Sequence, residues 1–118
     1  MNAAKEHFSR DWTVEDVHGT ESYDLRCRRG SIELHVEVKG TTTEGETVLL
    51  TPNEVDEAHE HPHMALFILR LIEVERDDQG TVVGARGGVP SVHLPWHIDD
   101  DALDAVGYKY EVPPPSQN

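Results

Sequence analysis

The chain has 118 residues and a formal net charge of −13, and its length fits one domain with a single hydrophobic core. Such an acidic composition argues against a protein that coats nucleic acid through general positive charge, although a bound metal cation can supply positive charge locally. No apolar run reaches the roughly 20 residues that span a membrane, the first residues lack a secretory signal, and the single cysteine, Cys27, allows no internal disulfide. We therefore expect a cytoplasmic protein with no membrane partner.

The first forty residues predict a helix followed by strands. Residues 1–12 predict a short opening helix whose core-facing side chains are Ala3, Ala4, Phe8 and Trp12. Residues 12–17 alternate weakly and predict a strand. Residues 22–29 and 31–40 predict two more strands, joined by a tight turn at residues 29–30, so that the pair forms a hairpin.

Alternation along residues 22–29 divides this strand into two faces. One face is expected to hold Tyr23, Leu25 and Cys27. The other face is expected to hold Asp24, Arg26 and Arg28. The first set is apolar, which makes Cys27 a core residue rather than a nucleophile.

A second helix is predicted after a short strand at residues 47–50. Thr51, Pro52 and Glu54 form a capping box with proline at the first helical position, and the helix should run to about His59 and stop before Pro62. Residues 63–75, the most hydrophobic segment, predict a central strand. The order indicates an α/β fold, with a small mixed β-sheet flanked by helices in the sequence α-β-β-β-α-β.

The remaining segments are predicted to hold little regular structure. Residues 81–96 are punctuated by glycine and proline and are expected to be poor in strand. Residues 99–107 predict a short helix, and residues 108–112 a last strand or an ordered strap. We expect a single domain over residues 1–113 and a disordered tail at 114–118.

The strand "IELHVEVKG", residues 32–40, offers the best candidate site. Glu37 and Lys39 are two residues apart and share one face, and Asp24 can lie beside them if the two strands pair. Two close carboxylates disfavour double ionisation, and Mg²⁺ or Mn²⁺ relieves that repulsion while activating water for phosphodiester hydrolysis. Spacing alone leaves open a solvent-exposed strand face with an ordinary Glu–Lys pair.

The chain also resembles a known family in several stretches. These are "GTESYDLRCRRG", "ELHVEVKGT", "VLLTPNEVDEA", "ALFILRLIEV", "PW" and "YKYEVP", and they cover most of the chain from about Trp12 to Pro113. They are similar to the NO VEIN C-terminal domain family, which in turn resembles the PD-(D/E)XK nuclease superfamily. The resemblance implies a restriction-endonuclease-like fold, with Asp24, Glu37 and Lys39 as catalytic residues and Asp24 and Glu37 as metal ligands.

Four further residues are candidates for contact with a substrate. Arg26 and Arg28, with Arg29 beside them, form the densest basic cluster and would bind phosphates or merely balance acids. His35 shares the face of Glu37 and is expected to be a surface histidine unless it contacts substrate. Asn53 matches a family position at the head of the second helix and is expected to reach the cleft.

Other polar residues have plainer explanations. His59, His61 and His63 suggest a transition-metal site, but alternate histidines across a helix end fix no geometry, and a solvated helix end explains them. The capping role explains Glu54. Glu6 is the acid of the opening helix, where many members of the nuclease superfamily have a residue that supports the metal.

Two functional hypotheses follow, and the sequence leaves open whether the protein is an enzyme. The first is a Mg²⁺- or Mn²⁺-dependent endonuclease-like domain acting on DNA or RNA. The alternative is a non-catalytic module of the same fold that recognises nucleic acid, a protein partner or a second copy of itself.

Overall fold

A computed structural model describes residues 1–108 and 110–116. It contains one five-stranded mixed sheet with the strand order β1-β2-β3-β4-β5, in which β3 and β4 are parallel and the other neighbours antiparallel. The elements are α1 (Asn2–Phe8), β1 (Thr13–Asp16), β2 (Leu25–Arg29), β3 (Ile32–Gly40), α2 (Pro52–Glu60), β4 (Met64–Arg76), β5 (Val82–His93) and the 3₁₀ helix η1 (Asp100–Ala102). The predicted α/β class with a mixed sheet is confirmed.

Helix α1 covers the apolar face of the sheet. Its residues Ala4 and Phe8 are buried against Leu34 and Val36 of β3 and against Phe67 of β4, with Trp12 partly buried at the edge of this core. The ring centroids of Phe8 and Phe67 lie 6.1 Å apart with the rings edge to face, a favoured aromatic arrangement. The predicted core face of the opening helix is therefore confirmed.

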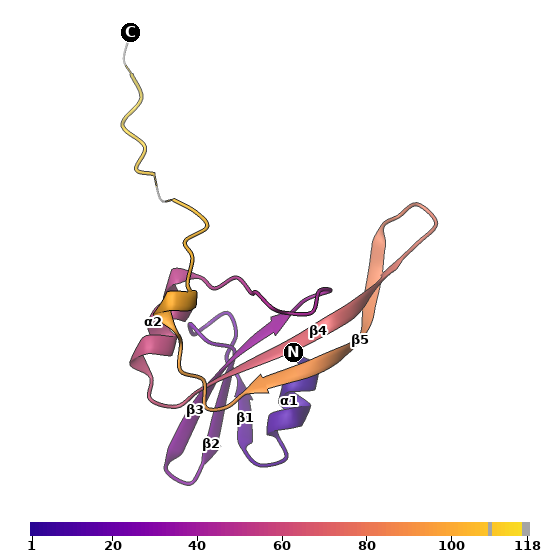
Figure 1. Cartoon of the computed structure of the whole chain (residues 1–118), viewed down its shortest axis with the longest axis vertical. Coiled ribbons are helices and arrows are strands. Elements are labelled where there is room, and N and C mark those ends of the chain that lie inside the picture. The colour runs from indigo at the N-terminus through magenta and orange to yellow at the C-terminus, as the bar shows by residue number, and fades with distance from the viewer. Residues whose placement is uncertain (109, 117–118) are drawn as a thin grey trace.

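Helix α2 covers the opposite face of β3 and connects it to the parallel strand β4. Strand alternation turns Leu34 and Val36 toward α1, so His35 and Glu37 point toward α2. A crossover helix is the usual way to join two parallel strands. Figure 1 shows α2 beside β3 and β4, with β4 and β5 extending together as a long hairpin beyond the rest of the sheet.

The start of α2 has the predicted capping box. The Thr51 side chain accepts a hydrogen bond from the Glu54 backbone N–H, and the Glu54 carboxylate accepts one from the Thr51 backbone N–H, with Pro52 at the first helical position. The helix ends at Glu60, close to the predicted end. These caps satisfy backbone donors that would otherwise lack partners at the helix start.

Replacing Thr51 with alanine is expected to lower the free energy of unfolding by about 1 kcal/mol, since the side-chain cap is lost. Urea unfolding followed by circular dichroism measures the change. Thr47→Ala, at an exposed position outside any helix or strand, is the matched control and is expected to have little effect. Equal losses in the two variants would contradict the capping role.

The prediction that residues 81–96 are poor in strand is wrong, because β5 occupies most of them. Among the described residues β5 is an edge strand that pairs with β4 alone, so Pro90 is tolerated where its missing N–H costs little. Gly88 has φ +105°, and a Cβ there would lie 2.7 Å from Leu69 Cγ. The local breaker signals thus describe a strand with irregular backbone rather than a loop.

Three smaller predictions also differ from the structure. Residues 47–50 form no strand, and the predicted helix at residues 99–107 is limited to η1. Residues 108 and 110–112 form neither strand nor packed strap, since Tyr108 and Tyr110 are exposed; position 109 lies outside the described residues. Positions 117–118 of the predicted tail also lie outside them, and residues 114–116 are exposed without regular structure.

Candidate functional site

The polar face of β3 is buried beneath α2 rather than exposed to solvent. Glu37 is 2% exposed and His35 is 7% exposed, which corrects the expectation that His35 is a surface residue. Polar side chains are rarely buried to this extent unless hydrogen bonds or charges satisfy them. The strand therefore holds a row of functional groups at a helix–sheet interface.

Asp24, Glu37 and Lys39 come together at this interface. The pairing of Leu25 with Val36 in the β2–β3 register sets Asp24 beside Glu37, and Asp24 Oδ2 accepts a hydrogen bond of 2.8 Å from the Val38 backbone N–H. Lys39 Nζ lies 3.4 Å from Glu37 Oε1. Strand pairing thus produces the three-residue arrangement that the sequence suggested.

Glu54 of α2 adds a third carboxylate to this group. Its two oxygens accept hydrogen bonds of 3.0 and 3.1 Å from Lys39 Nζ, while one of them also accepts the Thr51 backbone N–H. The capping role predicted for Glu54 is confirmed, but it was an incomplete explanation. The same side chain joins the helix start to the polar face of β3.

Close packing of these carboxylates changes their protonation. Burial, a hydrogen bond with Glu54 and the negative charge of Asp24 raise the pKa of Glu37 to about 9. Burial acts to raise the pKa of Glu54 as well, but hydrogen bonds from Glu37, the Thr51 N–H and Lys39 outweigh it and lower this pKa to about 2. Glu37 therefore holds a proton at neutral pH and shares it with ionised Glu54.

Lys39 remains a cation in this setting. Burial lowers its pKa, but the hydrogen bond and charge of Glu54 and the charge of Glu37 raise it further, so that the net shift is upward. A protonated lysine has three donors and no acceptor. It can hold a phosphate oxygen or orient a water molecule, but it cannot remove a proton from that water.

The basic residues predicted to contact substrate are already paired with acids. Arg26 hydrogen-bonds Glu15 and Glu21, each at 3.3 Å, and Arg28 Nε lies 3.2 Å from Glu33 Oε1. Nucleic-acid phosphates would have to compete with these carboxylates for both arginines. Arg29 lies over the Trp12 ring at 4.3 Å from its centroid, in a cation–π contact.

The remaining candidates lie apart from the carboxylate group. Asn53 is exposed at the head of α2, and Glu6 is exposed on α1, which covers the other face of the sheet. Glu6 therefore does not complete the group around Glu37. Cys27 is fully buried in the core, where burial raises its thiol pKa to about 11, so the prediction of a core cysteine is confirmed.

Tyr23 lies on the α2 side of the sheet, contrary to the alternation predicted for residues 22–29. β2 begins only at Leu25, so the strand period does not extend back to Tyr23. Its ring stacks on His35 with centroids 3.7 Å apart and an interplanar angle of 6°. Its hydroxyl accepts a 3.1 Å hydrogen bond from Arg26 Nε.

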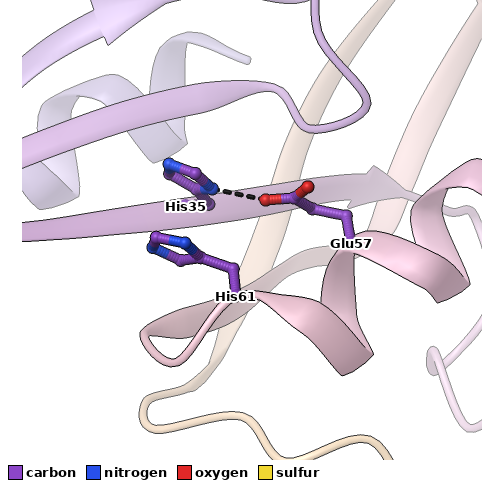
Figure 2. Close-up of side chains that lie close together, drawn as sticks. All are labelled: His35, Glu57 and His61. Carbon is purple, nitrogen blue, oxygen red and sulfur yellow. Dashed lines mark hydrogen bonds and ion pairs between the residues drawn. The ribbon is translucent and has the colours of Figure 1, made fainter.

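Of the three clustered histidines, His61 joins a side-chain cluster with His35 and Glu57. Their candidate ligand atoms all lie within 4.8 Å of one another, and the two imidazole rings are stacked with centroids 3.6 Å apart. Figure 2 shows the rings one above the other, with Glu57 to one side. The residues His59 and His63 are exposed, so the predicted solvated helix end is correct for them.

Sequence reasoning missed Glu57, although a signal was available. Glu54, Glu57 and His61 follow the spacing i, i+3, i+7, which places three polar residues on one helix face. The preceding strand also has a polar face, formed by Glu33, His35, Glu37 and Lys39. A polar helix face and a polar strand face close together in the sequence predict that the helix packs on that side of the strand. The pattern is informative only when α2 is paired with β3, and the helix sequence alone does not name its partner strand.

Comparisons with known proteins identify the family. The family described as "Protein NO VEIN, C-terminal" matches residues 1–83, a range that contains α1 to β4 and every residue of the two side-chain clusters. No curated protein and no solved structure matches the chain. Within the described part of the chain, no helix has the length and apolar character to cross a membrane. Since the match covers more than half of the sequence, the chain belongs to the NO VEIN C-terminal domain family.

Proposed function

We propose that this domain hydrolyses phosphodiester bonds of nucleic acid in a metal-dependent reaction, with Asp24, Glu37 and Lys39 as its catalytic residues. The observation that supports the proposal most directly is the burial of Glu37 between two other carboxylates, Asp24 and Glu54, beside a single lysine. This group has more carboxylate than one lysine can neutralise. A divalent cation would correct the imbalance.

The donor set fits Mg²⁺ or Mn²⁺. Both ions prefer hard oxygen ligands, and Mg²⁺ sites typically use one or two carboxylates with water and phosphate completing the shell. Asp24 and Glu37 would supply these oxygens, and Glu37 would give up its proton on binding. When bound, such an ion lowers the pKa of a water molecule and stabilises negative charge on a phosphate.

The protein's own residues would perform distinct tasks in this reaction. The Val38 N–H fixes the orientation of the Asp24 carboxylate. Lys39 would hold a phosphate oxygen or orient the attacking water, for which it must release at least one of its contacts with Glu54. Glu54 therefore competes with substrate for Lys39 and keeps the lysine in position when substrate is absent.

Lys39→Ala is expected to reduce cleavage of nucleic acid in the presence of Mn²⁺ by at least about 100-fold, since removing one group that stabilises transition-state charge typically costs this much. Supercoiled plasmid, single-stranded DNA and RNA serve as substrates, and gel electrophoresis measures the products. Glu46→Gln, in an exposed loop, is the control and should cleave at the wild-type rate.

Mn²⁺ should also raise the melting temperature of the wild type, because it binds the folded site. Glu37→Ala is expected to abolish that shift. Cleavage that survives in Lys39→Ala, or a wild type whose melting temperature does not respond to millimolar Mg²⁺ or Mn²⁺, would count against the proposal.

A second candidate function is a non-catalytic recognition module. Apolar side chains exposed along the β4–β5 hairpin support it: Leu71, Val74, Val82 and Val83 are 41%, 38%, 54% and 64% exposed. β5 also forms an edge of the sheet, and unpaired edges are common docking points. If the domain is such a module, none of the substrates should be cleaved. The backbone amides of the hairpin should then be protected from hydrogen exchange when the protein dimerises or binds a partner.

A further inference from the structure

The cluster of His35, Glu57 and His61 is built from two elements that face each other. His35 belongs to β3, while Glu57 belongs to α2 and His61 caps its C-terminal end (Figure 2). Glu57 and His61 are four residues apart, which places both on the same side of the helix. The His35 side chain is 9% exposed and that of Glu57 is 17% exposed, so the cluster is largely shielded from water.

Both imidazole rings are held from the same side by Glu33. His35 Nε2 lies 2.7 Å from Glu33 Oε2, and His61 Nε2 lies 2.7 Å from the Glu33 backbone carbonyl oxygen. A carbonyl accepts only, so His61 Nε2 must carry a hydrogen, and the ionised Glu33 carboxylate requires the same of His35. In a neutral ring this leaves Nδ1 as the free acceptor.

This arrangement of outer contacts is the one that metal-binding histidines use. Such a histidine typically donates its other N–H to a carboxylate or a backbone carbonyl, which fixes the tautomer and orients the ring. Here one acidic residue performs this task for two rings at once, through its side chain and its main chain. His35 Nδ1 then faces Glu57 Oε1 at 2.5 Å, so that two nitrogens and one carboxylate remain as ligands.

Without a metal, the contact between His35 and Glu57 needs a proton. Both nitrogens of His35 lie against carboxylate oxygens, so the contact between Nδ1 and Glu57 Oε1 is a hydrogen bond only when one of these two atoms carries a hydrogen. The His35 ring is stacked between Tyr23 and His61. A divalent ion can replace the proton between His35 Nδ1 and Glu57, and it can recruit His61 Nδ1 as well.

We propose that His35, Glu57 and His61 bind a divalent transition-metal ion of the Zn²⁺ class, at a site separate from the Asp24–Glu37 carboxylates. Two imidazole nitrogens and one carboxylate oxygen form a known ligand set for Zn²⁺, with water as the fourth ligand. Imidazole favours such ions over Mg²⁺. The two stacked ring planes are nearly parallel, with 10° between them, so the in-plane lone pairs of the two Nδ1 atoms cannot both point at one ion. Binding therefore turns the His61 ring out of the stack toward the ion.

The ion would join α2 to β3. The Glu54–Lys39 contact lies one helical turn away on the same two elements. Binding at the histidines therefore stabilises the position of the helix that supplies Glu54. Of the three histidines at residues 59, 61 and 63, only His61 belongs to this set. Glu57 and His35 lie within reach of His61, whereas His59 pairs with Asp100 of η1.

The test uses the full chain after treatment with a chelator. Isothermal titration with Zn²⁺ is expected to give one high-affinity ion per chain. Titration with Co²⁺ is expected to give an intense visible absorption band of the kind that four-coordinate cobalt produces. His61→Ala and Glu57→Gln are each expected to weaken Zn²⁺ binding by more than about 100-fold. Glu33→Gln is expected to weaken it by roughly 10- to 100-fold, as for other outer-shell residues.

Three controls separate this site from its surroundings. His63→Ala and Asp56→Asn, both exposed neighbours, should retain wild-type affinity. Glu37→Gln should also retain it, which separates this proposal from the phosphodiesterase proposal. Circular dichroism confirms that each variant folds, and His61→Gln replaces His61→Ala if the latter does not.

Several results would overturn the proposal. They are a wild type that shows no saturable Zn²⁺ binding, a weak cobalt spectrum of the six-coordinate kind, or an affinity that His61→Gln and Glu57→Gln leave unchanged. Loss of Zn²⁺ binding in Glu37→Gln would also overturn it, because the ion would then belong to the carboxylate group.

Discussion

Glu37→Gln is expected to make the protein more stable than the wild type at about pH 9 and to remove most of the wild type's loss of stability with rising pH. The pKa of Glu37 is raised from 4.5 to about 9 in the folded state, so between these values the folded state binds a proton that the unfolded state has lost. Stability therefore falls as pH rises through this window. Glutamine is uncharged and can still donate a hydrogen bond to Glu54.

The measurement is thermal unfolding of chelator-treated protein, followed by circular dichroism, at several pH values across this window. The wild type should lose several degrees in melting temperature, and the variant much less. Glu46→Gln, at an exposed position, should follow the wild type. Glu54 does not interfere, because its pKa is lowered to about 2 and its contribution disappears only at more acidic pH. Parallel curves for wild type and Glu37→Gln would refute the buried proton.

Phe67→Ala is expected to lower the free energy of unfolding by about 3 to 5 kcal/mol, since a large buried aromatic ring is replaced by a cavity. Phe67 is 1% exposed and lies in the core between β4 and α1. Its ring centroid lies 6.1 Å from that of Phe8 and 5.8 Å from that of His7. The loss should lower the melting temperature by roughly 10 to 20 °C for a domain of this size.

Urea unfolding gives the change in free energy directly. Val83→Ala, on the exposed part of the hairpin at 64% exposure, is the control and is expected to change stability by no more than about 0.5 kcal/mol. A loss below about 1 kcal/mol in Phe67→Ala would mean that α1 does not pack on the sheet in solution.

The sequence predicted the elements with regular patterns well. The 3.6-residue period of α1, the two-residue period of β3 and the capping box at Thr51 are all local signals, and each produced the expected element. The sequence-based prediction was wrong for β5, because glycine and proline do not exclude a strand at the edge of a sheet. Pairing with β4 supplies the stability that the local sequence lacks.

The candidate site was predicted in part. Asp24, Glu37 and Lys39 were found because strand alternation and hairpin pairing are short-range consequences of sequence. The capping box predicts only the capping role of Glu54, and no sequence prediction includes Glu57. Both face β3 across the helix–sheet interface, in contacts that span 15 residues for Lys39 and Glu54 and 22 residues for His35 and Glu57. The polar face of α2 indicates such contacts only when it is paired with the polar face of β3.

The sequence by itself determined which residues of β3 share a face, since side chains in a strand point alternately to opposite sides. It did not determine what lies against that face. Only the tertiary structure decided that α2 covers it, which leaves Glu37 at 2% and His35 at 7% exposure. That burial raises the pKa of Glu37 and brings His35 to Glu57 and His61, because charge and hydrogen bonding depend on neighbours that only the packed chain provides.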